Sequence, residues 1–395
     1  MWMRGSGGGQ DNTVRRKSMV EKRVIRGKVE KKFLMGNEAI AWGAILAGCR
    51  YFFGYPITPQ NEIGEFFARE LPRLGGVFVQ VEAEMASIAA LYGAATTGVR
   101  AMTSTSSPGW ALMQEGISCA TVAELPMVIA HVQRGGPGQG SISHSQMDYF
   151  SVTRGGGHGG YKTIVLAPTY TQEMCDLAQL AFHLADKYLT PVILLSDGLL
   201  GRVTETIEVR PLDFGPLPPK DWAVGGTASR ESGEPRRIST ARGQGMVRLP
   251  DGSSMPFTDF AEHLSEKWQK IMDNEVRYTT YQVDDADMVL VSYGSSGRAC
   301  RDTVDIGRAK GIKLGLFRPI TLWPFPHQEI HALAQQGSKK FVAVEDSMTG
   351  LIEDVKLAVE GKGEVHRVGL SIRDMRTAMG TINPDRVFSE IEQWL

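Results

Sequence analysis

Short apolar segments alternate with helical segments along most of the chain, with only brief connections between them. The segments Gly76–Val81 and Pro126–Val132 have the length and composition of buried strands, and residues 83–98 between them have the apolar spacing of a helix. Parallel strands need a crossover of this kind, whereas antiparallel strands can be joined by tight turns. The alternation therefore predicts an α/β fold, with parallel sheets covered by helices on both faces.

The pattern occurs in two blocks, which we assign to two parallel-sheet domains. The first block covers residues 33–210 and the second covers residues 283–395. Residues 211–282 form a connection rich in Pro, Gly, Ser and charge, in which residues 258–276 have the spacing of an amphipathic helix. Residues 1–32 are first glycine-rich and then basic, without the apolar segment of a secretory signal, and are expected to be a flexible basic leader.

The composition argues against several classes of function. The 395 residues are 42% hydrophobic and carry a formal net charge of −1, so no attraction to nucleic acid or to an anionic membrane is expected. No apolar stretch approaches the roughly 20 residues that span a bilayer. The four cysteines lie far apart without a CxxC pair, which argues against an iron–sulfur cluster or a structural zinc on this chain and favours a cytoplasmic location.

The sequence GYPITP directly follows a strand-like segment and precedes a helical one. Pro56 and Pro59 fix their own backbone angles and hold Thr58 between them. Ligands of open parallel sheets bind at the carboxyl ends of strands, where a rigid loop with one hydroxyl suits a small polar group. The residues alone favour the plainer alternative, a turn followed by a helix cap.

Glu82 and Glu84 stand where the next strand ends and a helix begins. Acidic residues at such positions usually interact with the helix dipole. Glu84 precedes an apolar run, so we expect its side chain to point inward while Glu82 stays exposed. A buried carboxyl group holds its proton more readily and can share it with a ring nitrogen.

A glycine-rich loop, residues 133–161, follows the strand-like segment Pro126–Val132. A loop of this length inside a compact domain is usually functional or mobile. Arg134 stands at the strand end, where a guanidinium group can grip a carboxylate through two hydrogen bonds; an ordinary surface arginine is an equal alternative. His144 and His158 in the same loop are expected to be exposed.

Two features of the second domain are interpreted as structural. The segment Ser292–Cys300 is similar to a turn that binds phosphate at a helix N-terminus, but a tight strand–helix turn is favoured. The segment Leu316–Pro326 is interpreted as a corner, and its side chains Trp323 and Phe325 are expected to be exposed for subunit assembly.

Together these motifs resemble the α subunit of 2-oxoacid:ferredoxin oxidoreductases, most closely the 2-oxoisovalerate type and then the 2-oxoglutarate type. The resemblance extends from Gly36 to about Val368. The motifs that carry it are GYPITP at 54–59, EAEMASIAALYGAATTG at 82–98, TSTSSPG at 103–109, RGGPGQG at 134–140 and LFRPITLWPFP at 316–326. The ordered set is more specific than any one of its motifs.

The resemblance implies a thiamine-diphosphate pyrimidine-binding domain followed by a transketolase C-terminal-like domain. Enzymes of this family oxidatively decarboxylate a 2-oxoacid with thiamine diphosphate, pass electrons to [4Fe-4S] clusters and ferredoxin, and yield an acyl-CoA. Glu84 matches the catalytic glutamate that hydrogen-bonds N1′ of the pyrimidine. Thr58 and Arg134 match residues that bind the substrate carboxylate, and Tyr55, Pro56 and Thr58 match the cofactor-binding loop.

The sequence lacks the motif by which thiamine enzymes hold the diphosphate through Mg²⁺, a GDG triplet followed by an asparagine. By the resemblance, a β subunit carries that half of the site with its Mg²⁺, no metal is expected on this chain, and the clusters lie on partner subunits. The other expected partners are γ and ferredoxin-like subunits, ferredoxin and coenzyme A. Two alternatives stay open: half of another thiamine enzyme, of the dehydrogenase E1 or transketolase kind, or a non-catalytic assembly subunit.

Overall fold

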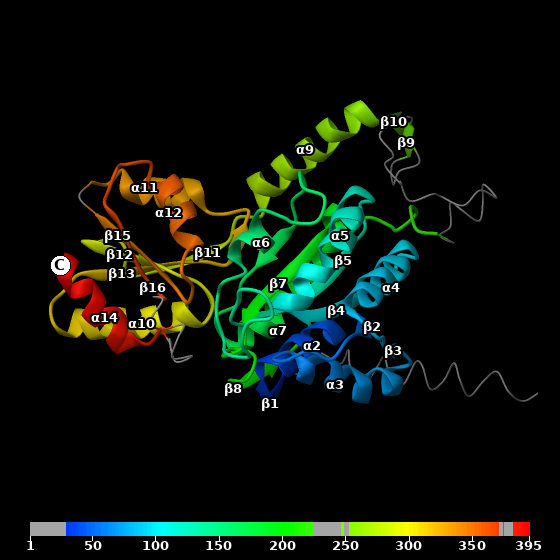
Figure 1. Ribbon diagram of the computed structural model, residues 1–395, viewed down its shortest axis with the longest axis horizontal. Coiled ribbons are helices and arrows are strands. Elements are labelled where there is room, and N and C mark those ends of the chain that lie inside the picture. The colour runs from blue at the N-terminus through cyan, green and yellow to red at the C-terminus, as the bar shows by residue number, and fades with distance from the viewer. Residues whose placement is uncertain (1–28, 225–245, 249–252, 338, 371–373, 375–381) are drawn as a thin grey trace, which may run out of the picture.

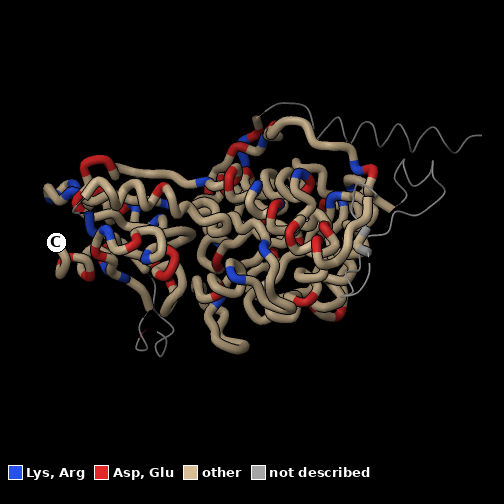
Figure 2. The backbone as a smooth tube through the Cα atoms, turned by 90° about the horizontal axis from the view of Figure 1, so that it is seen from above, with Lys and Arg blue, Asp and Glu red and all other residues tan. Residues whose placement is uncertain are grey.

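A computed structural model of the chain describes residues 29–224, 246–248, 253–337, 339–370, 374 and 382–395. The chain folds into two lobes, each built around a mainly parallel sheet that helices cover on both faces (Figure 1). The predicted α/β class with two parallel-sheet units is therefore confirmed. Lys and Arg are interspersed with Asp and Glu over both lobes, and neither sign gathers on one side (Figure 2).

The first lobe contains a seven-stranded sheet in the order β14-β6-β7-β5-β4-β2-β3. Six of its strands are parallel, and β14 joins the edge antiparallel to β6. The central strands β5 and β7 are buried along their whole length, as expected for apolar runs covered on both faces. The strands are β2 (Tyr51–Gly54), β3 (Val77–Gln80), β4 (Ala101–Ser106), β5 (Met127–Gln133), β6 (Ile164–Leu166), β7 (Pro191–Asp197) and β14 (Thr321–Trp323).

Helices α2 (Gly36–Leu46), α3 (Asn61–Glu70) and α7 (Thr171–Tyr188) cover one face of this sheet. Helices α4 (Glu84–Thr96) and α5 (Ser107–Val122) cover the other face (Figure 1). Helix α2 approaches α7 closely at Gly43, where an added Cβ would come within 2.2 Å of the Cys175 carbonyl oxygen. The short helices α6 (Tyr149–Thr153) and η1 (Pro72–Leu74) complete the lobe.

A two-stranded ribbon lies beside α2, with β1 (Glu30–Met35) antiparallel to β8 (Thr204–Val209). Residues 30–32 were assigned to the flexible leader, and this assignment is corrected because they belong to β1. Their alternating charged side chains lie on an exposed strand, and the partner strand is far away in sequence. Residues 1–28, the rest of the proposed leader, lie outside the described residues.

The second lobe contains a five-stranded sheet in the order β11-β13-β12-β15-β16, parallel except for β11. Helices α10 and α14 pack together against it, and α11 and α12 form a second pair. The elements are β11 (Tyr278–Tyr281), β12 (Met288–Val291), α10 (Gly294–Ala309), β13 (Leu314–Pro319), α11 (His327–Ala334), β15 (Lys340–Glu345), α12 (Leu351–Val359), β16 (Val365–Gly369), α14 (Pro384–Ile391) and η2 (Glu392–Trp394).

The connection between the lobes contains α9 (Phe257–Asn274), which agrees closely with the amphipathic helix read from the sequence. A short hairpin of β9 (Met246–Arg248) and β10 (Ser254–Pro256) precedes it. Helix α9 is fixed to the first lobe because Glu124 accepts a hydrogen bond from Lys267 and pairs with His263, both at 2.9 Å. Residues 225–245 and 249–252 of the connection lie outside the described residues.

The corner after β13 ties the lobes together and does not form an exposed surface. Strand β14 leaves the second lobe and pairs with β6 of the first sheet. Trp323 and Phe325 are therefore only 8% and 7% exposed, so the expectation that they are exposed was wrong. The sequence alone could not show that this short segment completes a sheet built more than 100 residues earlier.

Candidate functional site

Five neighbouring strands of the first sheet end along one edge. Strands β2, β3, β4, β5 and β7 run in parallel, so their carboxyl ends meet there. The segments that follow carry every residue that the sequence suggested: residues 55–60 after β2, residues 81–84 after β3 and Arg134 after β5. Ligands of open α/β sheets bind at this edge. The candidate residues therefore share the edge at which a ligand is expected.

The loop after β2 is fixed by hydrogen bonds as well as by its prolines. The buried Gln60 side chain donates to the Tyr55 carbonyl oxygen at 3.0 Å and accepts a hydrogen bond from the Ser104 hydroxyl. The Asn37 side chain on α2 donates to the Pro59 carbonyl oxygen at 2.9 Å. Gln60 and Asn37 were not recognised in the sequence, because a buried amide leaves no local pattern.

Thr58 and Arg134 lie in direct contact. The Arg134 guanidinium donates to the Thr58 carbonyl oxygen at 2.8 Å and to the Gln139 carbonyl oxygen at 2.9 Å. Its Nε atom is buried and has no partner among the described residues. Arg134 is therefore held in place by two carbonyl groups and keeps N–H donors for a further acceptor.

A cavity of about 250 Å³ opens beside the same loop, between β2, β3 and α3. Its lining includes aromatic and amide side chains, among them Phe52, Tyr55, Phe78, Gln60 and Gln80, together with Pro56. Glu84, Thr58 and Arg134 do not line it, so it lies next to their edge of the site. Complete ligand pockets usually measure about 300–1,000 Å³. A cavity this small suits one part of a cofactor.

Glu84 is the first residue of α4, and its side chain is 7% exposed, whereas Glu82 is exposed. This difference agrees with the sequence-based expectation for the two carboxyl groups. The Glu84 carboxyl group packs over Gly109 at the start of α5, where an added Cβ would come within 2.7 Å of Oε1. Within the described ranges, no group donates a hydrogen bond to the Glu84 side chain. The carboxyl oxygens are not fully enclosed, so a ligand at this edge of the sheet can supply the missing partner.

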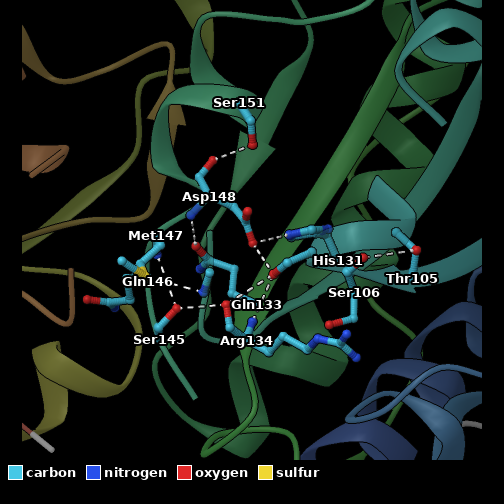
Figure 3. A network of polar contacts seen from close by, with 12 residues as sticks. Thr105, Ser106, His131, Gln133, Arg134, Ser145, Gln146, Met147, Asp148 and Ser151 are labelled. Atoms are coloured by element: carbon cyan, nitrogen blue, oxygen red, sulfur yellow. Dashed lines mark hydrogen bonds and ion pairs between the residues drawn. The ribbon is translucent and has the colours of Figure 1, made fainter. Parts of the chain in front are cut away.

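A second polar group, which includes Asp148 and His131, lies near Arg134 and was missed in the sequence (Figure 3). Asp148, at the start of α6, accepts a hydrogen bond from the Ser107 hydroxyl. The same carboxylate oxygen lies 3.0 Å from Nε2 of the buried His131. The Ser107 hydroxyl in turn accepts a hydrogen bond from the Arg134 backbone N–H at 3.0 Å. Single serines and histidines on strand ends give no spacing signal, so the sequence could not reveal this group.

The glycine-rich loop also joins the lobes, through Gln146. Its side chain donates to the Tyr293 carbonyl oxygen at 2.8 Å. It accepts hydrogen bonds from the Ser296 hydroxyl at 2.9 Å and from the Asp346 backbone N–H at 2.8 Å. The Asp197 carboxylate, at the end of β7, accepts the Ser295 backbone N–H at the start of α10. The helix N-terminus that resembled a phosphate site is thus capped by a protein carboxylate, in agreement with the favoured turn.

Asp346 lies at this contact between the lobes, beside Gln146, and is nearly inaccessible to water. Burial, followed by the charge of Asp197, raises the pKa of Asp346 to about 8. His144 Nε2 lies 3.4 Å from an Asp346 carboxyl oxygen. His144 is partly buried, so the expectation that it is exposed was wrong, whereas His158 is exposed as expected.

No three His, Cys, Asp or Glu side chains are arranged to hold a metal ion within the described ranges. Among the helices of the described ranges, none has the length and apolar character needed to cross a membrane.

The family models and the relatives that match this chain all point to one enzyme family. The model for the thiamine diphosphate-binding domain of pyruvate flavodoxin/ferredoxin oxidoreductase matches residues 42–244, and the model for core domain II of pyruvate:ferredoxin oxidoreductase matches residues 286–376. Ketoisovalerate oxidoreductase subunit VorB of Methanothermobacter marburgensis is 44% identical, over 89% of this chain and 97% of that protein. The 2-oxoglutarate synthase subunit KorA of the same organism is 36% identical, over 85% of this chain and 93% of that protein.

Two solved structures are similar to this chain. The 2-oxoglutarate:ferredoxin oxidoreductase of Magnetococcus marinus, solved with 2-oxoglutarate, coenzyme A and succinyl-CoA bound, is similar with a TM-score of 0.76 at 29% identity. The match covers 93% of this chain and 65% of that one. A split-gene transketolase, at 12% identity and a TM-score of 0.55, shares the fold alone.

The chain belongs to the 2-oxoacid:ferredoxin oxidoreductase family, as the sequence motifs indicated. It contains the family's thiamine diphosphate-binding domain and is a subunit of a multi-subunit oxidoreductase.

Proposed function

We propose that this chain is the α subunit of a complex that oxidatively decarboxylates a 2-oxoacid to an acyl-CoA and passes the electrons to iron–sulfur clusters and ferredoxin. When bound, thiamine diphosphate supplies a nucleophilic carbon and an electron sink for decarboxylation. This chain supplies the groups that hold the pyrimidine end of that cofactor and the carboxylate of the substrate.

The observation that carries the proposal is the environment of the Glu84 carboxyl group. Its carboxyl group is buried at the ligand-binding edge of the sheet and has no hydrogen-bond donor among the described residues. The N1′ nitrogen of the thiamine pyrimidine is a suitable partner, because a buried carboxyl group shares a proton readily with a ring nitrogen. Glu84 would hold a proton at that nitrogen and so act as the catalytic acid–base residue.

Arg134 and Thr58 are assigned to the substrate carboxylate. The Arg134 guanidinium group keeps N–H groups beyond its contacts with the Thr58 and Gln139 carbonyl oxygens, and guanidinium groups bind carboxylates strongly. Tyr55 and Pro56 line the neighbouring cavity, which suits a flat aromatic ring with polar edges. Thr58 lies in the loop that lines the cavity, and its carbonyl oxygen contacts Arg134, so we assign it to both substrate and cofactor.

Partner subunits are assigned the rest of the site. The sequence has no GDG triplet for Mg²⁺, so we place the diphosphate and Mg²⁺ half on a β subunit. The [4Fe-4S] clusters are placed on partners, with γ and ferredoxin-like subunits and ferredoxin as the further components. The cysteines of the described residues are free thiols, which supports a reducing cytoplasm as the location.

The test is turnover by the complex assembled with its partner subunits, thiamine diphosphate and coenzyme A. A panel of branched-chain 2-oxoacids, 2-oxoglutarate and aryl glyoxylates would be assayed by reduction of a viologen dye. We expect coenzyme A-dependent turnover, fastest with branched-chain substrates, because the 44% identity to the ketoisovalerate subunit exceeds the 36% identity to the 2-oxoglutarate subunit. Turnover without bound iron would favour another kind of thiamine enzyme, and a complex unaffected by loss of the Glu84 carboxyl would favour an assembly role.

A further inference from the structure

The backbone of Arg134 is held on both sides by serine hydroxyl groups (Figure 3). Its N–H donates to Ser107 Oγ at 3.0 Å, and its carbonyl oxygen accepts a hydrogen bond from Ser145 Oγ at 2.8 Å. Ser107 begins α5 and Ser145 lies in the glycine-rich loop, so two separate elements meet at this residue. The starting point of the Arg134 side chain is therefore fixed where the chain leaves β5.

Ser107 has only one hydroxyl hydrogen to donate. Its oxygen lies within hydrogen-bond distance of Asp148 Oδ2 and is 3.2 Å from the Arg134 carbonyl oxygen. Ser145 already donates to that carbonyl, and a carboxylate is the stronger acceptor. The Ser107 hydrogen is therefore assigned to Asp148, which leaves a lone pair of Ser107 facing the Arg134 N–H.

Asp148 is held by groups from β5. His131 Nε2 lies 3.0 Å from Asp148 Oδ2, and the Asp148 backbone N–H donates to the Gln133 side-chain oxygen at 3.3 Å. The His131 ring is fully buried, and its Nδ1 atom has no partner among the described residues. The hydrogen-bond pattern therefore assigns the ring hydrogen to Nε2, which donates to Asp148.

The segment that carries Asp148 is also anchored to the second lobe. The next residue, Tyr149, is fully buried and its hydroxyl donates to Asp354 at 2.5 Å. Arg154, at the end of α6, pairs with the same carboxyl group at 2.8 Å. Asp148 thus has little freedom to move relative to Ser107.

We propose that Asp148, acting through Ser107, is a positioning residue that holds Arg134 in the orientation needed to bind the carboxylate of a 2-oxoacid. The proposal rests on the proposed role of Arg134. Asp148 does not itself contact the substrate. Its effect is to fix the hydroxyl of Ser107, which fixes the backbone from which the guanidinium group extends.

The test is steady-state kinetics of the assembled complex with Asp148→Asn and with Ser107→Ala. Asparagine replaces the carboxylate by a neutral amide, whose single oxygen is a weaker acceptor for both Ser107 and His131. We expect each variant to raise KM for the 2-oxoacid about tenfold, to change kcat less than about threefold, and to leave KM for coenzyme A unchanged. Because both variants break one chain of contacts, the double variant is expected to be no worse than the more affected single variant.

The matched control is Asp186→Asn. The Asp186 side chain is 5% exposed, against 17% for Asp148, and it lies at the opposite end of the sheet, where Arg100 and Lys220 pair with it. This variant is expected to lower stability without a change in KM. An unchanged KM in Ser107→Ala, a KM in Asp148→Asn no higher than in the control, or multiplied effects in the double variant would each overturn the proposal. If Arg134→Ala itself leaves KM unchanged, the assigned role of Arg134 has failed instead.

Discussion

The carboxyl edges of the two sheets occupy equivalent places in their lobes but differ in how their polar groups are satisfied. In the second sheet, the Glu345 carboxylate accepts the backbone N–H groups of Leu351 and Ile352 at 3.0 and 3.3 Å. Asp197 of the first lobe caps α10. In the first sheet, the Glu84 carboxyl group has no donor within the described ranges.

The difference shows that a strand-end location is not sufficient for a ligand site. Both edges have the topology at which α/β proteins bind ligands. At the edge of the second sheet, backbone N–H groups satisfy Glu345, and Asp346 is enclosed although its Oδ1 atom has no partner among the described residues. The first sheet keeps a carboxyl group and guanidinium donors available to a ligand. This availability, more than the fold, supports our assignment of the site to the first lobe. The predictions below probe this contrast, starting with the largest expected effect.

Removing the Glu84 carboxyl is expected to have the largest effect. Glu84→Gln keeps the size of the side chain but removes its ability to share a proton with a pyrimidine nitrogen. Turnover of the complex should fall by about 10²–10⁴-fold, the usual contribution of a general acid–base group. Dye reduction with saturating 2-oxoacid measures it. The exposed Glu82→Gln is the control, and equal losses in both variants would contradict the assignment.

Arg134→Ala should mainly weaken substrate binding. Loss of a charge-assisted hydrogen bond costs about 1.5–3 kcal/mol, which corresponds to roughly 10–100-fold in KM for the 2-oxoacid. Initial rates over a range of 2-oxoacid concentrations measure this. Arg298→Lys is a suitable control, because Arg298 pairs with Glu205 at 2.8 Å and is not assigned to substrate. A KM close to that of the wild type would disprove the role of Arg134.

Gln146→Ala tests the contact between the two lobes, where the Gln146 side chain satisfies three groups of the second lobe. The substitution leaves buried groups of Tyr293, Ser296 and Asp346 without their partner, so we expect a loss of about 3 kcal/mol in the free energy of unfolding. Urea unfolding of the chain measures it. Gln172→Ala is the control: Gln172 also bonds backbone groups, at Glu208, but is only partly buried. An equally small loss of unfolding free energy in both variants would show that the Gln146 contacts between the lobes contribute little to stability.

The last prediction concerns the pH dependence of stability, which Asp346 is expected to change. Its pKa is about 8 in the folded chain, against an ordinary value of 3.8, because burial and then Asp197 disfavour its charged form. Between these pH values the folded state binds a proton that the unfolded state has released, so stability falls as pH rises from about 4 to about 8. Asp346→Asn removes this contribution.

Thermal unfolding at pH 5 and pH 8 measures the effect. The Asp346→Asn variant should lose less stability between the two values than the wild type does. The exposed Asp302→Asn should behave like the wild type. An Asp346→Asn variant with the wild-type pH dependence would show that Asp346 is charged in the folded chain at neutral pH.

The sequence was most informative where a local pattern repeats. The continuous apolar runs of β5 and β7 alternate with segments of helical composition, so the α/β fold could be predicted. Strands β1, β8 and β14 were missed because their partners are distant in sequence, and β14 has only three residues. The pairing of β14 also explains why Trp323 is buried.

For the site, the sequence indicated residues at strand ends but not the groups that support them. Glu84 could be expected to be buried because an apolar run follows it. The contact between Arg134 and the Thr58 carbonyl, and the link from Asp148 to Ser107, join residues far apart in the chain. Such contacts depend on the sheet order, which no local spacing encodes. The catalytic and binding roles of Glu84, Thr58 and Arg134 stay predictions.

A structure of the assembled complex with thiamine diphosphate tests the central claim most directly. The account predicts a Glu84 carboxyl oxygen about 2.6–3.2 Å from N1′ of the pyrimidine, with the diphosphate and its Mg²⁺ bound by a different chain. A Glu84 side chain facing bulk water, or a pyrimidine bound away from the first lobe, would contradict it.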